Sequence, residues 1–335
     1  MKGVAHASVA LLLSLACFSP GRAAAEPSLW QRAASPRAAR VERALVRMER
    51  VLDRVSEARD DQDMMQDFRL GTLAVAELTG ARELGDPRLL VLLSQALVDA
   101  ELGREGEAAA LLERALEGTP PEQVWLEAEI RPLLAAALRD DPARAAREVT
   151  RALRLVWQPG VRSLLLRERA EAKMALGQVR ASAADARAAL SAASSNVQRA
   201  LARYALGLAL ERAGDLPSAL NEIHLARLTA PALGGTEIGE LDVPGIFVFR
   251  PADSKYLAAL DALAAARTAS EPREAALGYE RAAVLFRHYA ALVPEGDRWV
   301  AVARVHAGEC ERAHESLART LKPQEPPPDS SGSFF

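Results

Sequence analysis

The chain has 335 residues and a formal net charge of −3, from 42 Lys and Arg against 45 Asp and Glu. A single globular core is near its practical limit at this length, so two domains or a repeat array are favoured. The balanced charge gives no general attraction to nucleic-acid phosphates or anionic membranes, which argues against a dedicated nucleic-acid binder. Two Cys residues cannot build a disulfide framework.

The first 25 residues have the pattern of an export segment. Lys2 precedes an apolar run over residues 9–18, and small residues lead to a cleavage site after Ala25, as in a secretory signal. The apolar run is too short to span a bilayer. We therefore expect residues 1–25 to be a signal peptide, residues 26–35 to be a linker, and the protein to be exported to the periplasm.

The same segment has a second interpretation. The pentapeptide LSLAC, residues 13–17, resembles a bacterial lipobox, in which Cys17 is lipidated and becomes the mature N-terminus. A lipid at Cys17 would attach the protein to the outer membrane and would be its sole membrane contact. Both interpretations stay open at this point.

Residues 36–86 are predicted to form an N-terminal helical cap. Ser35-Pro36 opens a helix whose apolar residues follow a 4-3-4-3 spacing, and a second helix is expected over residues 64–78. The end of a helical array needs a cap over its apolar face. The alternative is a dimeric structural protein that associates through this first helix. The spaced apolar residues are Val41, Leu45, Met48, Leu52 and Val55.

An internal repeat of 37 residues follows the cap. A turn-forming residue recurs at this interval, and columns of small residues stand five and twelve positions after it. Small residues seven apart lie on one helical face, where they permit close helix approach, so each unit is predicted to be a helix, a turn and a second helix. The turn column is Gly103, Asp140, Gly177 and Gly214; the small columns are Ala108, Ala145, Ser182 and Ala219, then Ala115, Ala152, Ala189 and Ala226.

This pattern resembles the tetratricopeptide repeat (TPR) family, whose repeat is 34 residues long. The fullest match is LGLALERAGDLPSALNEIHLARLTAP, residues 206–231. The resemblance implies an all-α, right-handed α-solenoid of about six TPR-like helix pairs. Four repeats are expected over 87–232 and two weaker ones over 255–321, the last with its turn at Gly308. The Pro- and Ser-rich segment 322–335 is expected to be a disordered tail.

Residues 233–254 interrupt the helical pattern and are expected to form a loop or hairpin. The β-prone run IFVF, residues 246–249, is bounded by Pro-Gly and Pro. Aromatic residues are concentrated from here onward, which marks either a second interface carried by Phe247 and Phe249 or a local core. These aromatics are Phe247, Phe249, Tyr256, Tyr279, Phe286, Tyr289 and Trp299.

Catalytic motifs are absent from the sequence: no phosphate loop, dinucleotide fingerprint, HExxH helix or GxSxG elbow occurs. We therefore expect no enzyme and no cofactor. His306, Cys310 and His314 have the spacing of metal ligands on a helix face, but a turn at Gly308 would separate them, so no metal site is expected. A metal-binding or enzymatic protein using these three residues is the alternative.

The resemblance also implies a concave groove lined by the first helix of each repeat, where positions five and nine face a partner. The expected function is a non-catalytic scaffold or adaptor in a bacterial envelope assembly, binding a protein or peptide segment. The alternative is that these residues pack on the chain's own insertion. The groove residues are Leu93 and Leu97, Ile130 and Leu134, Arg167 and Glu171, and Tyr204 and Leu208.

Overall fold

A computed structural model of the chain describes residues 39–46, 50, 85–99, 105–231, 245–246, 252–294 and 296–321, without the side chains of 96–99. The regular structure in these ranges is helical, which confirms the all-α prediction. The signal segment with Cys17, the linker, Phe247, Phe249 and the tail lie outside the described residues. The chain divides into a first unit, Met1–Ser194 with Asp242–Ile246, and a second unit, Ser195–Leu241 with Phe247–Phe335.

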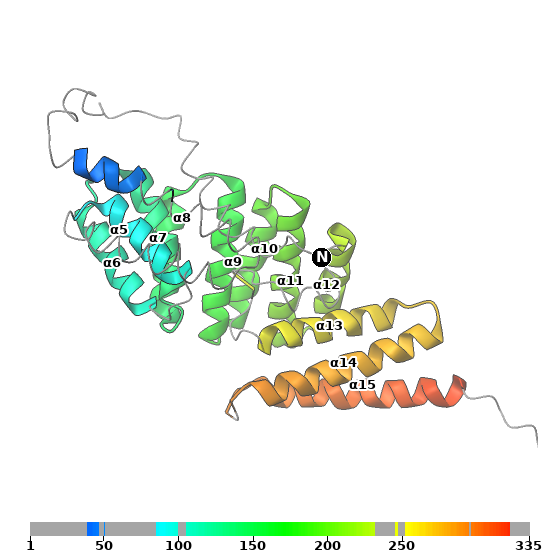
Figure 1. The fold of residues 1–335 in the computed structure, drawn as a ribbon. Helices are drawn as coiled ribbons and strands as arrows, with labels where there is room; N and C mark the ends of the chain where they lie inside the picture. The colour runs from blue at the N-terminus through cyan, green and yellow to red at the C-terminus, as the bar shows by residue number, and fades with distance from the viewer. Residues whose placement is uncertain are drawn as a thin grey trace, which may run out of the picture. The chain divides into compact units, whose positions relative to one another are not determined.

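The first unit contains three TPR-like helix pairs in succession (Figure 1). Within each pair the two helices pack against each other, and the second helix of one pair contacts the first helix of the next. The second helices begin at Glu105, Pro142 and Val179, which confirms the predicted interval of 37 residues. The pairs are α5 (Pro87–Asp99) with α6 (Glu105–Gly118), α7 (Val124–Ala137) with α8 (Pro142–Leu155), and α9 (Pro159–Ala175) with α10 (Val179–Ala192).

The second unit continues the pattern with one more pair and then changes it. The fourth pair is α11 (Asn196–Arg212) with α12 (Leu216–Thr229). Three further helices follow and lie side by side in Figure 1: α13 (Ala252–Thr268), α14 (Pro272–Leu292) and α15 (Val300–Leu321). Helix α13 begins at residue 252, so residues 252–254 belong to this helix and not to the predicted insertion.

The predicted turn at Gly308 is wrong, because Gly308 lies inside the continuous helix α15. Gly308 is not among the described glycines with a positive φ. An isolated glycine costs a helix only about 1 kcal/mol relative to alanine, and the buried face of α15 continues on both sides of it through Ala303, Ala307 and Cys310. The sixth unit is therefore one long helix where a helix pair was expected.

Glycine turns, as the sequence indicated, and aspartate caps set several of the helix ends. Gly177 and Gly214 have φ values of 73° and 87°, a conformation that residues with a side chain rarely adopt. After Gly214, the amide of Asp215 donates to the Leu210 carbonyl at 2.9 Å, as in a Schellman C-cap. The Asp141 carboxylate accepts from the Arg144 amide at 3.0 Å, with Pro142 at the first helical position of α8.

The small-residue columns lie where the helices of a pair meet. Every side chain in the two columns is buried, none more than 7% exposed. In the fourth pair, a Cβ on Gly207 of α11 would stand 2.7 Å from Ile223 Cγ1 of α12. The register inferred from the sequence is therefore the packing register.

The described part of the predicted cap is a helical segment over residues 39–46. Val41 and Leu45 are buried in one apolar cluster with Leu89 of α5, and Glu42 pairs with Arg88 at 3.3 Å. This segment thus packs on its own chain, as a cap would. The predicted cap helix over 64–78 lies outside the described residues.

Hydropathy gives no sign of a membrane span in the described part of the chain. None of its helices combines the length and the apolar character needed to cross a bilayer.

Candidate functional site

Helix α9 carries Arg167 and Glu171, the groove pair predicted for the third repeat. Side-chain bonds fix α9 against α10: Arg169 pairs with Asp185 at 2.8 Å through both its Nε and Nη2, and Lys173 reaches the same carboxylate at 2.6 Å. A bidentate arginine bridge restricts geometry as well as adding attraction. The face of α9 that bears Arg167 and Glu171 is therefore a fixed platform.

One residue of the insertion, Gly245, lies on this platform, and Ile246 follows it in the chain. The Gly245 amide donates a hydrogen bond of 2.7 Å to Glu171 Oε2, and Glu171 Oε1 faces Arg139 at 4.0 Å. The Ile246 side chain is buried. The first unit therefore holds a segment of its own insertion at a predicted groove position.

Glycine is required at position 245 for two reasons. Its φ is +82°, in the left-handed region. A Cβ there would stand 2.6 Å from Arg167 Cβ and 2.7 Å from both the Arg167 carbonyl carbon and the Glu168 amide nitrogen. The Cα of Gly245 thus sits directly against the backbone of α9, where no side chain fits.

The charges beneath this contact are desolvated. Burial lowers the pKa of Arg167 to about 10, against the opposing pull of Glu168 and Glu171. Burial also raises the pKa of Glu168 to about 7; Glu171 adds to the rise, while Arg167 and Arg139 oppose it. The Oε2 atom of Glu168 is buried without a hydrogen-bond partner among the described residues. The protonation of Glu168 therefore changes near neutral pH.

Five of the other predicted groove residues lie in the core. Leu93, Ile130 and Leu134 belong to one buried cluster of the first unit, and Tyr204 and Leu208 are buried in α11 of the second unit. The side chain of Leu97 lies outside the described set. The five described side chains are buried and form no open surface. Partner binding at these positions therefore stays a prediction. The pair on α9 is the one for which the structure shows a contact with the insertion.

The histidine and cysteine candidates share helix α15, because Gly308 makes no turn. Both histidines already have a hydrogen-bond partner: His306 Nε2 bonds Glu211 Oε1 at 2.9 Å, and His314 Nδ1 bonds the Ala276 carbonyl at 2.9 Å. Cys310 is buried, which raises the pKa of its thiol to about 11. Within the described ranges, no group of three His, Cys, Asp or Glu side chains is arranged to hold a metal ion.

A buried ion pair in the second unit was missed by sequence reasoning. Arg212 Nη2 contacts Asp253 Oδ1 at 2.6 Å with both side chains fully buried. The guanidinium lies 5.2 Å from the ring centroid of Tyr256 and 4.9 Å from that of Trp299, within the range of cation–π attraction. The aromatic enrichment was the available signal, but nothing in the sequence linked Arg212 to Asp253.

The aromatics of the second unit that the structure describes mostly form a local core. Tyr256, Phe286 and Tyr289 are fully buried. The Tyr256 ring meets the other two edge to face, with centroids 5.2 Å and 4.8 Å apart. For these three residues the core interpretation is the observed one.

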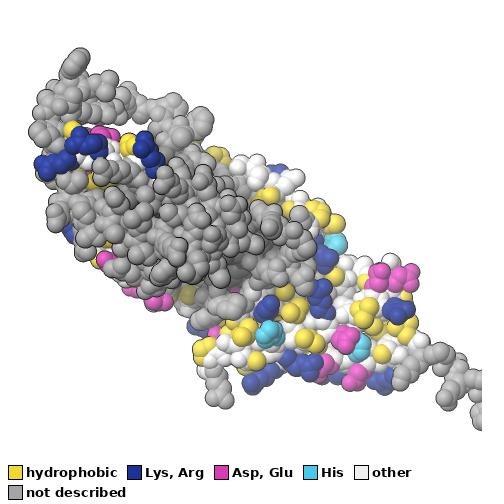
Figure 2. Space-filling view, viewed as in Figure 1, with side chains coloured by type: hydrophobic (Ala, Val, Ile, Leu, Met, Phe, Trp, Pro, Cys, Tyr) yellow, Lys and Arg dark blue, Asp and Glu magenta, His cyan; other side chains and the backbone are white. Residues whose placement is uncertain are grey.

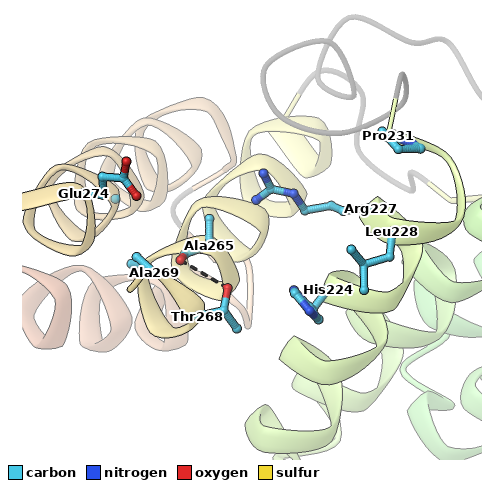
Figure 3. Close-up of a pocket in the computed structure, with 10 residues that line it drawn as sticks. His224, Arg227, Leu228, Pro231, Ala265, Thr268, Ala269 and Glu274 are labelled. Atoms are coloured by element: carbon cyan, nitrogen blue, oxygen red, sulfur yellow. Dashed lines mark hydrogen bonds between the residues drawn. The ribbon is translucent and has the colours of Figure 1, made fainter. Parts of the chain in front are cut away.

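A pocket of about 510 Å³ opens between α12 and the α13–α14 hairpin (Figure 3). Arg227 on its wall contacts Asp261 Oδ1 at 3.5 Å, and Leu228 is 64% exposed. No sequence signal pointed to this pocket. Its lining consists of His224, Arg227, Leu228, Pro231, Ala265, Ala266, Thr268, Ala269, Glu274 and Gly278.

The surface over α13–α15 is mixed in character. On the face shown in Figure 2, basic, acidic and apolar side chains alternate over these helices. One exposed pair there joins Arg287 and Glu311 at 3.0 Å. This mixed surface gives no sign of a docking site for a polyanion.

Comparison with known proteins gives a weak structural likeness. No protein-family model matches the chain, and no curated protein matches it. Among solved structures, the chain is similar to one titled "Crystal structure of MamA protein", with 17% sequence identity and a TM-score of 0.41, over 56% of this chain and 93% of that one. A likeness at this level adds nothing to what the helix pairs already show.

Proposed function

We propose that the chain is a non-catalytic protein-interaction scaffold or adaptor whose first-helix face binds a segment of a partner. One observation carries the proposal: α9 holds Gly245 through a hydrogen bond to Glu171, and the side chain of the next residue, Ile246, is buried. The same face can bind a partner segment by the same contacts.

Exposed aromatic residues of the first unit support an interaction role. Trp125 in the first turn of α7 is 50% exposed, and Trp157, two residues before α9, is 73% exposed. Both residues stand at the N-terminal end of the first helix of a pair: Trp125 in α7 and Trp157 just before α9. They therefore occupy equivalent places in successive pairs. Tryptophan is enriched at protein interfaces and scarce on inert surfaces.

The proposed setting is the bacterial envelope. Residues 1–25 direct export, and the mature protein is either periplasmic or attached to the outer membrane through Cys17. Mass spectrometry of the mature N-terminus distinguishes a cut before Glu26 from a lipidated Cys17. An unprocessed N-terminus beginning at Met1 would contradict the proposed location.

Affinity capture from an envelope extract tests the function. The tagged full chain is compared with Glu171→Ala, which removes the acceptor on α9, and with Glu311→Ala, which removes a carboxylate from an exposed pair on α15. We expect the wild type and Glu311→Ala to retain the same proteins and Glu171→Ala to lose them. Equal retention by all three, or by none, would contradict binding through α9.

A further inference from the structure

We propose that Gly245 and Ile246 act as an internal ligand of the α9 site, and that a partner displaces them with a segment of the same chemistry: a glycine in a left-handed turn conformation, followed by an aliphatic residue. This inference rests on the proposed function, because it names the partner of that site. It also implies that the site is closed in the free protein and opens by exchange of one segment for another.

The contact itself defines what a partner must present. The amide that donates to Glu171 Oε2 at 2.7 Å cannot come from proline, which has no N–H. The residue that carries this amide cannot bear a side chain, because a Cβ would meet the α9 backbone at 2.7 Å. The next residue must fill the space that Ile246 occupies without contact with water. A glycine with an aliphatic neighbour meets all three conditions.

The charges around the site favour a neutral segment. Arg167 and Glu168 lie beneath it in a desolvated environment, and Glu171 already faces Arg139. An additional buried charge without a partner would be strongly unfavourable there. The partner segment is therefore expected to carry no charge at its glycine or at the aliphatic residue.

Covalent attachment gives the internal segment an advantage over a partner. A tethered segment has an effective concentration on the order of millimolar. The apparent affinity for an outside segment falls by the fraction of molecules in which the site is free. A variant that cannot seat its own segment should therefore bind a free peptide more tightly than the wild type does.

The test uses a labelled peptide with the sequence of residues 241–250 and measures its binding to the full chain by fluorescence anisotropy. The variant Gly245→Ala cannot place its own segment on α9, whereas its α9 residues are unchanged. Gly106→Ala is the matched control, because a Cβ at Gly106 meets nothing within 4 Å. We expect Gly245→Ala to bind the peptide about tenfold more tightly than the wild type, and Gly106→Ala to bind as the wild type does.

A second peptide identifies the chemistry. With alanine in place of the glycine that corresponds to Gly245, the peptide should lose binding to Gly245→Ala. Equal binding of both peptides, or equal affinity of the wild type and Gly245→Ala, would overturn the internal-ligand proposal.

A measurement on the wild type keeps the proposal testable if Gly245→Ala fails to fold. In the wild-type chain, saturating unlabelled peptide should speed hydrogen exchange at the Gly245 amide at least threefold, since exchange reports opening of that bond. An unchanged rate would count against displacement. If these tests fail while Glu171→Ala still loses captured envelope proteins, the proposed function stands without this inference; if capture is also insensitive to Glu171→Ala, both are overturned.

Discussion

At the residue scale, glycine and other small residues determine how closely two backbones approach. The small columns let the two helices of each pair meet, and Gly207 shows how little space remains there. Gly245 uses the same freedom to place an insertion residue against α9. The two contexts differ in predictability. A periodic column is visible in the sequence, whereas a single glycine in an irregular segment carries no period.

The first residue-scale prediction concerns the small columns. Ala219→Leu places a large side chain where α11 and α12 touch, so overpacking should cost roughly 1–3 kcal/mol. Ala110→Leu, on the exposed face of α6, makes the same change without a packed neighbour and should cost little. Urea denaturation of both variants gives the two values. An unchanged urea midpoint for Ala219→Leu would show that the repeat register is wrong.

The second prediction concerns pH. The pKa of Glu168 is about 7 in the folded chain against an ordinary value of 4.5, so between these values the folded state holds a proton that the unfolded state has released. The contribution of Glu168 to stability therefore decreases as pH rises from about 4.5 to 7. The conversion of about 1.4 kcal/mol per pKa unit makes this a loss of a few kcal/mol at most.

Glu168→Gln isolates that contribution. His306 changes stability in the same direction. Burial lowers its pKa, but the hydrogen bonds and negative charges of Glu211 and Glu309 together outweigh burial and raise the pKa above 6.5, so the stabilising effect of His306 is lost as pH rises. Urea denaturation of the wild type and Glu168→Gln at pH 5, 6, 7 and 8 should show a weaker pH dependence in the variant. Parallel curves would mean that Glu168 titrates normally.

At the element scale, the sequence predicted the four regular pairs because their turn residues and small residues recur at one interval. It failed at α15 because glycine is ambiguous. Gly177 and Gly214 adopt positive φ and end helices, whereas Gly308 is helical within α15. What distinguishes them is the structure that follows, and after Gly308 the buried helical face simply continues through Cys310.

Substitution by alanine should separate these two kinds of glycine. Gly308→Ala should stabilise the protein by about 0.5–1 kcal/mol, because alanine favours the helix interior and the new Cβ meets only Arg312 Nη1 at an ordinary 3.5 Å. Gly214→Ala should destabilise it, since φ is +87° there. Thermal unfolding measures both. A lower melting temperature for Gly308→Ala would indicate that Gly308 forms a turn, as the sequence predicted.

At the scale of the whole molecule, the contacts that the sequence could not reveal join distant parts of the chain within one unit. The repeat register placed Arg167 and Glu171 on the inner face of α9, but their occupant comes from 74 residues further along the chain. In the second unit, Arg212 and Asp253 are 41 residues apart. Such contacts depend on where the chain lies after it leaves the regular repeats, and no local sequence pattern encodes that path.

The last prediction uses the buried pair of the second unit to ask whether the two units unfold separately. Asp253→Ala leaves the fully buried Arg212 without its carboxylate, which should cost about 3–5 kcal/mol. Glu311→Ala breaks an exposed pair and should cost less than about 1 kcal/mol. Because Trp299 lies over Arg212, its fluorescence reports unfolding of the second unit in a chain whose other tryptophans, Trp30, Trp125 and Trp157, are replaced by Phe.

Urea unfolding followed by tryptophan fluorescence and by helical circular dichroism gives the answer. With Asp253→Ala, the change in Trp299 fluorescence should move to lower urea, while a second helical transition, from the first unit, stays at the wild-type midpoint. Replacing both partners by apolar residues, Arg212→Met with Asp253→Leu, should recover part of the loss, because no unpaired charge is then buried. A single shifted transition in both signals would show instead that the helical array unfolds as one cooperative body, with the buried pair stabilising all of it.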